Sequence, residues 1–337
     1  MIWLTWRQFR GHAAGVLALL AVLSAALVIT GRPRVGQGLG PSGTDTVLYF
    51  GGIVAVYALP AVLGAFWGAP LVARELEAGT HRLVWNQTVT RSRWLGTKLA
   101  VIGFGAAAAA GLLCLVVTWW ADPYDAASRP STIAGPDPGA ESITARLSPL
   151  VFGARGIAPL GYAAFAFVLG VVAGIVLRRT VAAMAVTLAV FVAVQVAVPV
   201  VVRPHILPPV SETVRITPTN LARFGVNGSE NRVEALEVAE PQGAWGLGNV
   251  TVDAEGRTVQ PPSWLIDCVL PAGAGEQAPA VWQRCFSELA AQGYRQRVTY
   301  QPASRFWPLQ WGETGIYLVL SALLVLVGLR WTRSRLS

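Results

Sequence analysis

Six long apolar segments constrain this chain more than any other feature of its sequence. Each has close to the roughly 20 residues that an α-helix needs to cross a hydrocarbon core of about 30 Å. Burial in lipid also agrees with the composition, because 53% of the residues are hydrophobic and only 13% are charged. The sequence therefore predicts a mainly α-helical, polytopic membrane protein with six transmembrane helices, at residues 13–30, 47–72, 99–120, 156–177, 180–202 and 314–330.

The first apolar segment has one alternative interpretation, a secretory signal peptide, because Arg7 and Arg10 precede it. However, the segment is long, and no clear small-residue cleavage site stands before Arg32 and Arg34. We therefore expect the segment to be retained as a helix.

The distribution of basic residues predicts the orientation of these helices. Lys and Arg in short loops accumulate on the cytoplasmic side of a membrane. With both termini inside, the cytoplasmic side holds twelve basic residues against Glu75 and Glu77, a charge of +10. The remaining 14 Arg and 16 acidic residues give −2 outside, and the total is the +8 of the whole chain. The sequence thus predicts a multi-pass protein of the cell membrane with both termini in the cytoplasm, and the basic excess needs no nucleic-acid partner.

The stretch between the fifth and sixth segments is long enough to bury a small core of its own. Val250 and Val259 flank a turn at Asp253–Gly256, which predicts a β-hairpin. An apolar face over residues 279–292 predicts a helix, and a short strand follows at 297–301. We therefore expect three parts: an interfacial helix and five spans at 1–202, a small mixed α/β extracytoplasmic domain at 203–312, and the sixth span with a cytoplasmic tail at 313–337.

Two cysteines, Cys268 and Cys285, fall in the predicted external domain. Cysteines in an oxidising compartment favour a disulfide. Closing the loop of about 17 residues between them would contribute roughly 3 kcal/mol in the chain-entropy model. The alternative is that Cys285 only packs with Phe286. A metal site is not expected, because no histidine is close in the sequence.

No arrangement of residues predicts catalysis. Gly96–Lys98 lacks the preceding glycine and the spacing of a phosphate-binding loop. His12, His81 and His205 stand apart, without the companions of a metalloprotease or hydrolase motif. We predict no catalytic residue, no metal and no cofactor in this chain.

The six segments carry no Asp, Glu, Lys or Arg in their cores. Ion-coupled carriers keep ionisable groups there, because a charge in lipid is costly and is retained for function. We therefore expect the energy for transport to come from another subunit. Gln195 and Tyr57 are the most polar mid-segment residues and are candidates for a substrate path. The alternative role for both is interhelical hydrogen bonding.

Small residues and prolines predict how some of these helices pack. Gly64 with Gly68, and Gly170 with Gly174, have the spacing that lets membrane helices approach closely. Pro60, together with Pro70, predicts a kink in the second helix.

The most specific pattern lies between the second and third segments, at residues 73–99. It predicts a helix that leaves the membrane, a break at Gly79, a short amphipathic segment and a capped start of the third span. The alternative is an ordinary charged loop that holds the topology. The candidate contact residues are Glu75, Glu77, Gly79, Thr80, His81, Arg82, Trp85, Arg91 and Arg93.

This pattern resembles the first cytoplasmic loop of ABC-2 type permeases. The shared features are an acidic residue before Gly79 and Thr80, a short helix, and Arg93 followed by Trp94 at the entry to the third span. In that family the loop is a coupling helix seated in a cleft of the ATPase subunit. The resemblance implies two ABC ATPase subunits that hold ATP and Mg, and a second permease copy or paralogue as partner.

Aromatic residues at both ends of the chain extend the resemblance. Trp3 and Trp6 lie in an amphipathic start that resembles the interfacial connecting helix of the family. The segment around Phe306, Trp307 and Trp311 resembles a branch of the family common in actinobacteria. Independently, aromatic side chains at such a position predict a belt that anchors the chain in membrane lipid. The large external domain departs from many relatives, which have a short re-entrant hairpin at that place.

These features together predict the permease subunit of an ATP-driven ABC exporter. Apolar, uncharged spans suggest a hydrophobic or amphipathic cargo such as an antibiotic, lipid or peptide, which includes drug efflux. The alternative is an ABC-type sensory or mechanotransmission complex that acts on an extracytoplasmic partner without carrying cargo. A membrane-embedded enzyme would need a polar catalytic constellation that the sequence lacks.

Overall fold

The chain folds into two units, each with its own core. The computed structural model describes residues 2–31, 43–79, 91–127, 146–227, 229, 231–269 and 278–335. The helical unit comprises residues 1–124, 149–206 and 307–337, and the strand unit comprises residues 125–148 and 207–306. The predicted domain limits at 203 and 312 therefore move to 207 and 306, because the flanking helices continue past their apolar stretches.

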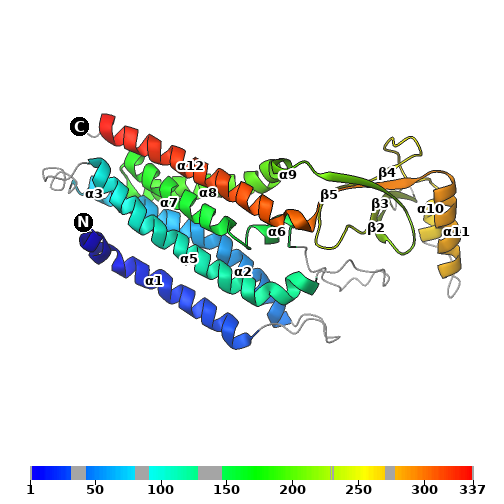
Figure 1. The fold of residues 1–337 in the computed structure, drawn as a ribbon, viewed down its shortest axis with the longest axis horizontal. Coiled ribbons are helices and arrows are strands. Elements are labelled where there is room, and N and C mark those ends of the chain that lie inside the picture. The colour runs from blue at the N-terminus through cyan, green and yellow to red at the C-terminus, as the bar shows by residue number, and fades with distance from the viewer. Residues whose placement is uncertain are drawn as a thin grey trace. The chain divides into compact units, whose positions relative to one another are not determined.

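The helical unit is built from long apolar helices (Figure 1). Within the described residues, five helices are long and apolar enough to cross a membrane, and they coincide with the second to sixth predicted segments. The second segment is one continuous run of α2 Gly43–Val62, the π-helix η1 Leu63–Gly68 and α3 Ala69–Glu77. The third and fourth are α5 Arg91–Ala127 and α7 Ala158–Leu177, and the short α6 Pro149–Phe152 lies between them in the chain. The fifth is a second run of α8 Thr180–Ala197, the π-helix η2 Val198–Val202 and α9 Arg203–Ile206, and the sixth is α12 Phe306–Arg335.

The first predicted segment lies in α1, a single helix from Ile2 to Thr30. Its apolar part, Ala14–Thr30, is shorter than the other five spans, so the structure supports five spans by length and composition and leaves the sixth as a prediction. The predicted interfacial helix is not separate from this segment, because the helix continues through Trp3 and Trp6 without a break. The side chains of these two residues lie outside the described part of the chain.

Helix α7 is the most enclosed span, and glycines explain how its neighbours approach it. Of its apolar window, 72% is buried, compared with 17% in the run that contains α8. A Cβ atom on Gly64 would lie 2.5 Å from the Ala166 carbonyl oxygen, and one on Gly174 would lie 2.6 Å from the Ala69 carbonyl oxygen. Backbone contact at this distance requires glycine. The predicted close packing of both glycine pairs is therefore confirmed.

The run of α2, η1 and α3 changes helix type where the sequence predicts a kink. Pro60 lies inside α2, shortly before the π-helix, and Pro70 lies in the first turn of α3. Proline removes a backbone donor from the helix ladder, and π-segments are among the recognised sites of helix distortion. The second run repeats this feature, because Pro199 lies in η2.

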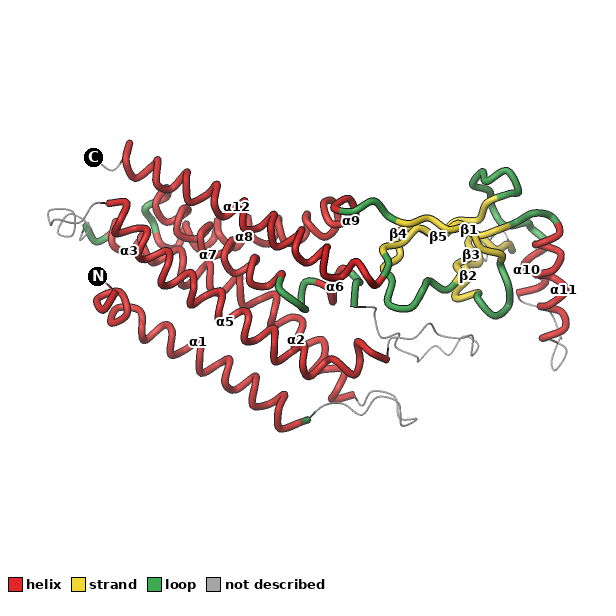
Figure 2. Tube along the Cα trace, viewed as in Figure 1, coloured by secondary structure: helices red, strands yellow, loops and turns green. Residues whose placement is uncertain are grey.

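The strand unit contains two antiparallel sheets and two helices (Figure 2). One sheet has the order β1-β5-β4, and the other pairs β2 with β3. This arrangement confirms a small strand-containing region with helices. The bounds are β1 Val210–Arg215, β2 Leu221–Asn227, β3 Arg232–Val238, β4 Trp245–Val252, α10 Leu265–Val269, α11 Ala278–Ala291 and β5 Arg295–Gln301.

The predicted hairpin around Asp253–Gly256 is reduced to a turn with one isolated bridge. Val252 pairs with Thr258, but no strand follows. Instead, the whole of β4 pairs with β5, which comes much later in the chain. The turn itself forms as expected, with Gly256 at φ +80°. Local sequence therefore predicted the turn correctly and the strand partner wrongly.

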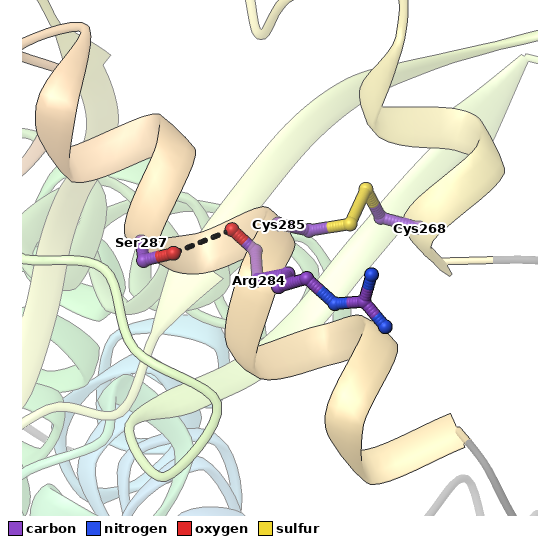
Figure 3. Close-up of a disulfide and its surroundings, with 4 residues drawn as sticks. All are labelled: Cys268, Arg284, Cys285 and Ser287. Carbon is purple, nitrogen blue, oxygen red and sulfur yellow. Dashed lines mark hydrogen bonds between the residues drawn. A yellow bond between two sulfur atoms is a disulfide. The ribbon is translucent and has the colours of Figure 1, made fainter.

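The core of the strand unit lies between the sheets and α11. Phe286 and Leu289 are buried on the predicted face of α11, and Gly293 ends the helix region at φ +84°. Cys268 of α10 is joined by a disulfide to Cys285 of α11 (Figure 3). In the chain-entropy model such a closed loop contributes roughly 3 kcal/mol to stability. For a unit with so small a core, this is a large share.

Candidate functional site

The end of α3 is where the predicted coupling segment begins. The helix closes with the Ala78 amide donating to the Arg74 carbonyl oxygen at 3.0 Å, and Gly79 follows at φ +68°. This left-handed conformation allows the break that the sequence predicts. Of the other candidate contacts, Arg91 and Arg93 lie at the start of α5 with side chains that are not described, and Thr80, His81, Arg82 and Trp85 lie outside the described residues.

Glu75 forms an ion pair inside the chain. Its Oε1 lies 2.6 Å from Lys98 Nζ, and the two side chains are only 22% and 6% exposed. The Lys98 ammonium also lies 4.4 Å from the centre of the Trp94 ring, a cation–π contact. Lys98 is the only lysine of the chain, and the sequence analysis did not assign it a partner. The pair ties the end of α3 to the start of α5.

Glu77, the last residue of α3, makes the corresponding link to α8. Its Oε2 accepts a hydrogen bond from Thr180 Oγ1 at 2.5 Å and a longer one from the Thr180 amide at 3.4 Å. Thr180 is the first residue of α8, so the carboxylate satisfies a free helix N-terminus. The two acids of α3 therefore attach it to two other spans.

A second polar site lies deep in the helical unit. Arg203 and Glu313 form a bidentate ion pair, in which Arg203 Nε lies 2.6 Å from Glu313 Oε2 and Arg203 Nη2 lies 3.0 Å from Glu313 Oε1. Both side chains are completely buried. The predicted segments carry no ionisable residue in their cores, but both residues of the pair lie within the longer helical runs that contain the fifth and sixth segments. The fifth predicted segment ends just before Arg203 and the sixth begins just after Glu313, whereas the helices continue through both residues.

Further hydrogen bonds and a cation–π contact surround this ion pair. Arg203 Nη1 donates to the Pro149 carbonyl oxygen at 3.1 Å, and the guanidinium carbon lies 4.3 Å from the centre of the Phe152 ring. Tyr162 of α7 donates its hydroxyl to Glu313 Oε1 at 2.5 Å. The pair thus joins α9, α6, α7 and α12. A buried charge is tolerated when it is paired and hydrogen-bonded in this way.

Gln310, one turn before Glu313, holds the start of α7. Its Oε1 accepts hydrogen bonds from the amides of Ile157 and Ala158 at 3.0 and 2.8 Å. Its Nε2 donates to the Phe152 carbonyl oxygen at 2.9 Å. Ile157 occupies the N-cap position and has no side chain that could cap, so Gln310 supplies the missing acceptor from α12.

Of the two predicted substrate-path residues, Tyr57 contacts this polar site, whereas Gln195 contacts Tyr317, whose ring packs against Tyr162. The Tyr57 hydroxyl donates to the Pro149 carbonyl oxygen at 3.3 Å, and its ring stacks on Tyr162 with centroids 6.3 Å apart. Gln195 Oε1 accepts a hydrogen bond from the Tyr317 hydroxyl at 3.2 Å. Their contacts here are interhelical hydrogen bonds, which was the alternative reading of the sequence, and the substrate path stays a prediction.

The C-terminal aromatic residues divide into two kinds. Trp307 and Trp311 are 50% and 66% exposed, as an aromatic belt requires. Phe306 is only 4% exposed and packs under the Arg146 guanidinium, whose central carbon lies 3.7 Å from the ring centre. The anchor prediction is therefore wrong for Phe306, because a buried ring does not reach lipid.

Together, the apolar helices and the enclosed polar site define a multi-pass helical membrane protein with an inserted strand unit. Residues 42–203 match the family model described as ABC-2 membrane transporter related. This match confirms the resemblance seen in the sequence over that region and supports an ABC-2 type permease. No curated protein and no solved structure matches the chain.

Proposed function

We propose that this chain is the permease subunit of an ATP-driven ABC exporter that moves a hydrophobic or amphipathic compound out of the cell. The observation that carries the proposal is the family match over residues 42–203, which includes the whole stretch between the second and third spans. Two ABC ATPase subunits would bind ATP and Mg, and a second copy or a paralogue would complete the permease. Antibiotics, lipids and peptides are the cargo classes that suit apolar spans.

The contacts at the end of α3 support a route for the movement. A force on residues 74–94 would reach α5 through the ion pair of Glu75 with Lys98, and α8 through the hydrogen bonds of Glu77 with Thr180. The partly buried ion pair resists separation more than an exposed pair does, and the exposed hydrogen bond of Glu77 is strengthened by the charge of its carboxylate. The helices that follow the coupling segment would therefore move together with α3.

Trp85→Ala and Gly79→Val test this function. A buried aromatic at an interface often carries about 2 kcal/mol or more of binding energy, so Trp85→Ala should weaken association with the ATPase subunit. Valine resists the positive φ of Gly79, so Gly79→Val should misdirect the coupling segment. The measurement is the yield of ATPase that co-purifies with each variant, together with export by the same complex.

Each variant has a matched control. Gly31 also has a positive φ at the end of a helix and open space around it, so Gly31→Val introduces the same strain elsewhere. Trp311→Ala removes an exposed tryptophan from α12. Arg91→Ala and Arg93→Ala should have milder effects. If Trp85→Ala and Gly79→Val both kept normal complex yield and normal export, residues 74–94 would be an ordinary loop without a coupling role.

The orientation is a separate proposal: both termini in the cytoplasm and the strand unit outside. It rests on the +10 and −2 partition of charge. Cysteines introduced at Glu255, in an exposed turn of the strand unit, and at Ala78, at the exposed end of α3, should differ in intact cells. An impermeant thiol reagent should label the first and not the second until the cells are opened. Equal labelling in intact cells would contradict the orientation.

The alternative is a mechanotransmission complex in which ATP hydrolysis moves the strand unit against an extracytoplasmic partner. The separate core of that unit favours this candidate. Reconstituted complexes would then show ATP hydrolysis that depends on the partner, while no cargo crosses the vesicle membrane. Export of a compound by the purified complex would reject it.

A further inference from the structure

Arg203 lies three residues before one place where the chain passes between the units and contacts Pro149, the residue at another. The chain leaves the helical unit after Ile206 and returns to it at Pro149 and Trp307. Arg203 shares the single turn of α9 with Ile206, donates to the Pro149 carbonyl oxygen, and pairs with Glu313 of α12, the helix that contains Trp307. All of these contacts lie within the helical unit. Within the helical unit they therefore join three helices that precede or follow a crossing: α9, α6 and α12.

Stability alone does not account for such a pair. Taking two charges out of water is costly, and apolar residues of similar volume often stabilise a protein as well or better. Ionisable groups inside membrane spans are a default sign of function for the same reason. A pair that joins three helices is well placed to hold one arrangement of them against another.

The helix before Arg203 offers a way to release it. Residues Val198–Val202 form the π-helix η2, which ends directly at Arg203. A π-segment contains one residue more per turn than an α-helix, and a shift of one residue turns the following side chains by about 100°. Such a shift would rotate Arg203 away from Glu313 without unfolding the helix.

Two neighbouring polar groups point to a second arrangement. Thr314 is only 6% exposed, and its buried Oγ1 has no hydrogen-bond partner within the described residues. The buried Nε2 of Gln195 likewise has none there, although its Oε1 is bonded to Tyr317. Buried polar groups are nearly always satisfied, so partners for both groups in another state would explain them.

We propose that Arg203 and Glu313 are positioning residues that lock the helical unit in the arrangement described here, and that the lock separates in each ATP-driven cycle. The proposal rests on the proposed function, because the ATPase subunits supply the energy for separation. Thr314, adjacent to Glu313 and buried, provides a reporter that leaves the pair intact.

The experiment measures the rate at which N-ethylmaleimide labels Thr314→Cys. The background is Cys114→Ser, because Cys114 is the one cysteine outside the disulfide. The complex with its co-purified ATPase is placed in vesicles of phosphatidylethanolamine and phosphatidylglycerol, with no nucleotide or with ATP, Mg and vanadate. Ala109→Cys, buried in α5, serves as the control reporter.

Labelling of Thr314→Cys should be slow without nucleotide and roughly ten-fold or more faster in the vanadate-trapped complex, because a buried thiol reacts from the opened state. Glu313→Gln should raise the rate similarly without nucleotide. The double variant Arg203→Met with Glu313→Leu removes both charges, so it should fold and also label quickly. Ala109→Cys should stay slow in all of these samples.

Three results would overturn the lock. If nucleotide left the labelling rate of Thr314→Cys unchanged in a complex that hydrolyses ATP, the ion pair would stay closed throughout the cycle. Equal acceleration at Ala109→Cys would mean general loosening of the helices. Slow labelling in the double variant would mean that the pair is not what keeps the site closed. If no ATPase co-purifies, the proposed function itself fails and the lock fails with it, which distinguishes the two cases.

Discussion

Glu313→Leu is expected to destabilise the helical unit more than any other single exchange of a charged residue discussed above. It leaves the Arg203 guanidinium buried without its carboxylate, although the Pro149 carbonyl oxygen and the Phe152 ring still contact it. Removing one partner of a buried pair costs about 3–5 kcal/mol. The measurement is the thermal unfolding midpoint of the purified protein in detergent, with the yield of monodisperse protein as a second readout.

The double variant Arg203→Met with Glu313→Leu is the matched control for this prediction. It removes the same carboxylate but leaves no unpaired charge, so its stability should return close to that of the wild type. Glu255→Leu provides a surface control, because that side chain is 65% exposed. An exposed change of this kind should alter stability by no more than about 0.5 kcal/mol. If the single and double variants were equally unstable, the loss would come from packing and not from the uncompensated charge.

Gly170→Val should have the second large effect. A Cβ atom at this position would overlap the Gly64 carbonyl oxygen and lie 2.8 Å from the Ala69 amide nitrogen. Both are backbone atoms, so no side-chain rotation relieves the overlap and the helices have to separate. Overpacking typically costs about 1–3 kcal/mol and occasionally more. We expect the upper end of this range, seen as a lower thermal midpoint and a lower yield in the membrane.

Gly105→Val separates this effect from the general cost of valine in a membrane helix. Gly105 lies inside α5, and a Cβ atom there would meet nothing within 4 Å. The two variants therefore share the change in propensity and differ only in the close backbone contact. Equal behaviour of Gly105→Val and Gly170→Val would show that close approach to η1 and α3 contributes nothing to stability.

The apolar segments could be predicted because the length of an apolar run is a property of the sequence alone. A run of about 20 apolar residues has few alternatives to a membrane helix, since every backbone polar group must be satisfied inside the lipid. For this reason five segments recur as long helices. The glycine spacing and the Gly79 break were readable for similar local reasons, because each concerns residues within a turn or two of one another. The family resemblance rested on the same local pattern.

The ends of the spans were not readable in this way. The fifth segment was predicted to end just before Arg203 and the sixth to begin just after Glu313, because an isolated charge is unfavourable in lipid. Each residue neutralises the charge of the other and so lowers the cost of burying it, although 110 positions separate them in the chain. The pairing of β4 with β5, instead of with the residues after its turn, likewise depends on residues that are distant in the sequence.

Composition and local spacing therefore predicted the class of protein, its apolar helices, the turn at Asp253–Gly256 and the resemblance to a family that residues 42–203 match. The tertiary structure alone specified which polar groups meet: Lys98 with Glu75, Thr180 with Glu77, and Arg203 with Glu313. The physical reason is that lipid burial acts on each segment separately, whereas the cost of burying a charge depends on a partner brought close by packing. Polar contacts between helices, on which the proposed transport movement depends, are thus decided only when the helices assemble.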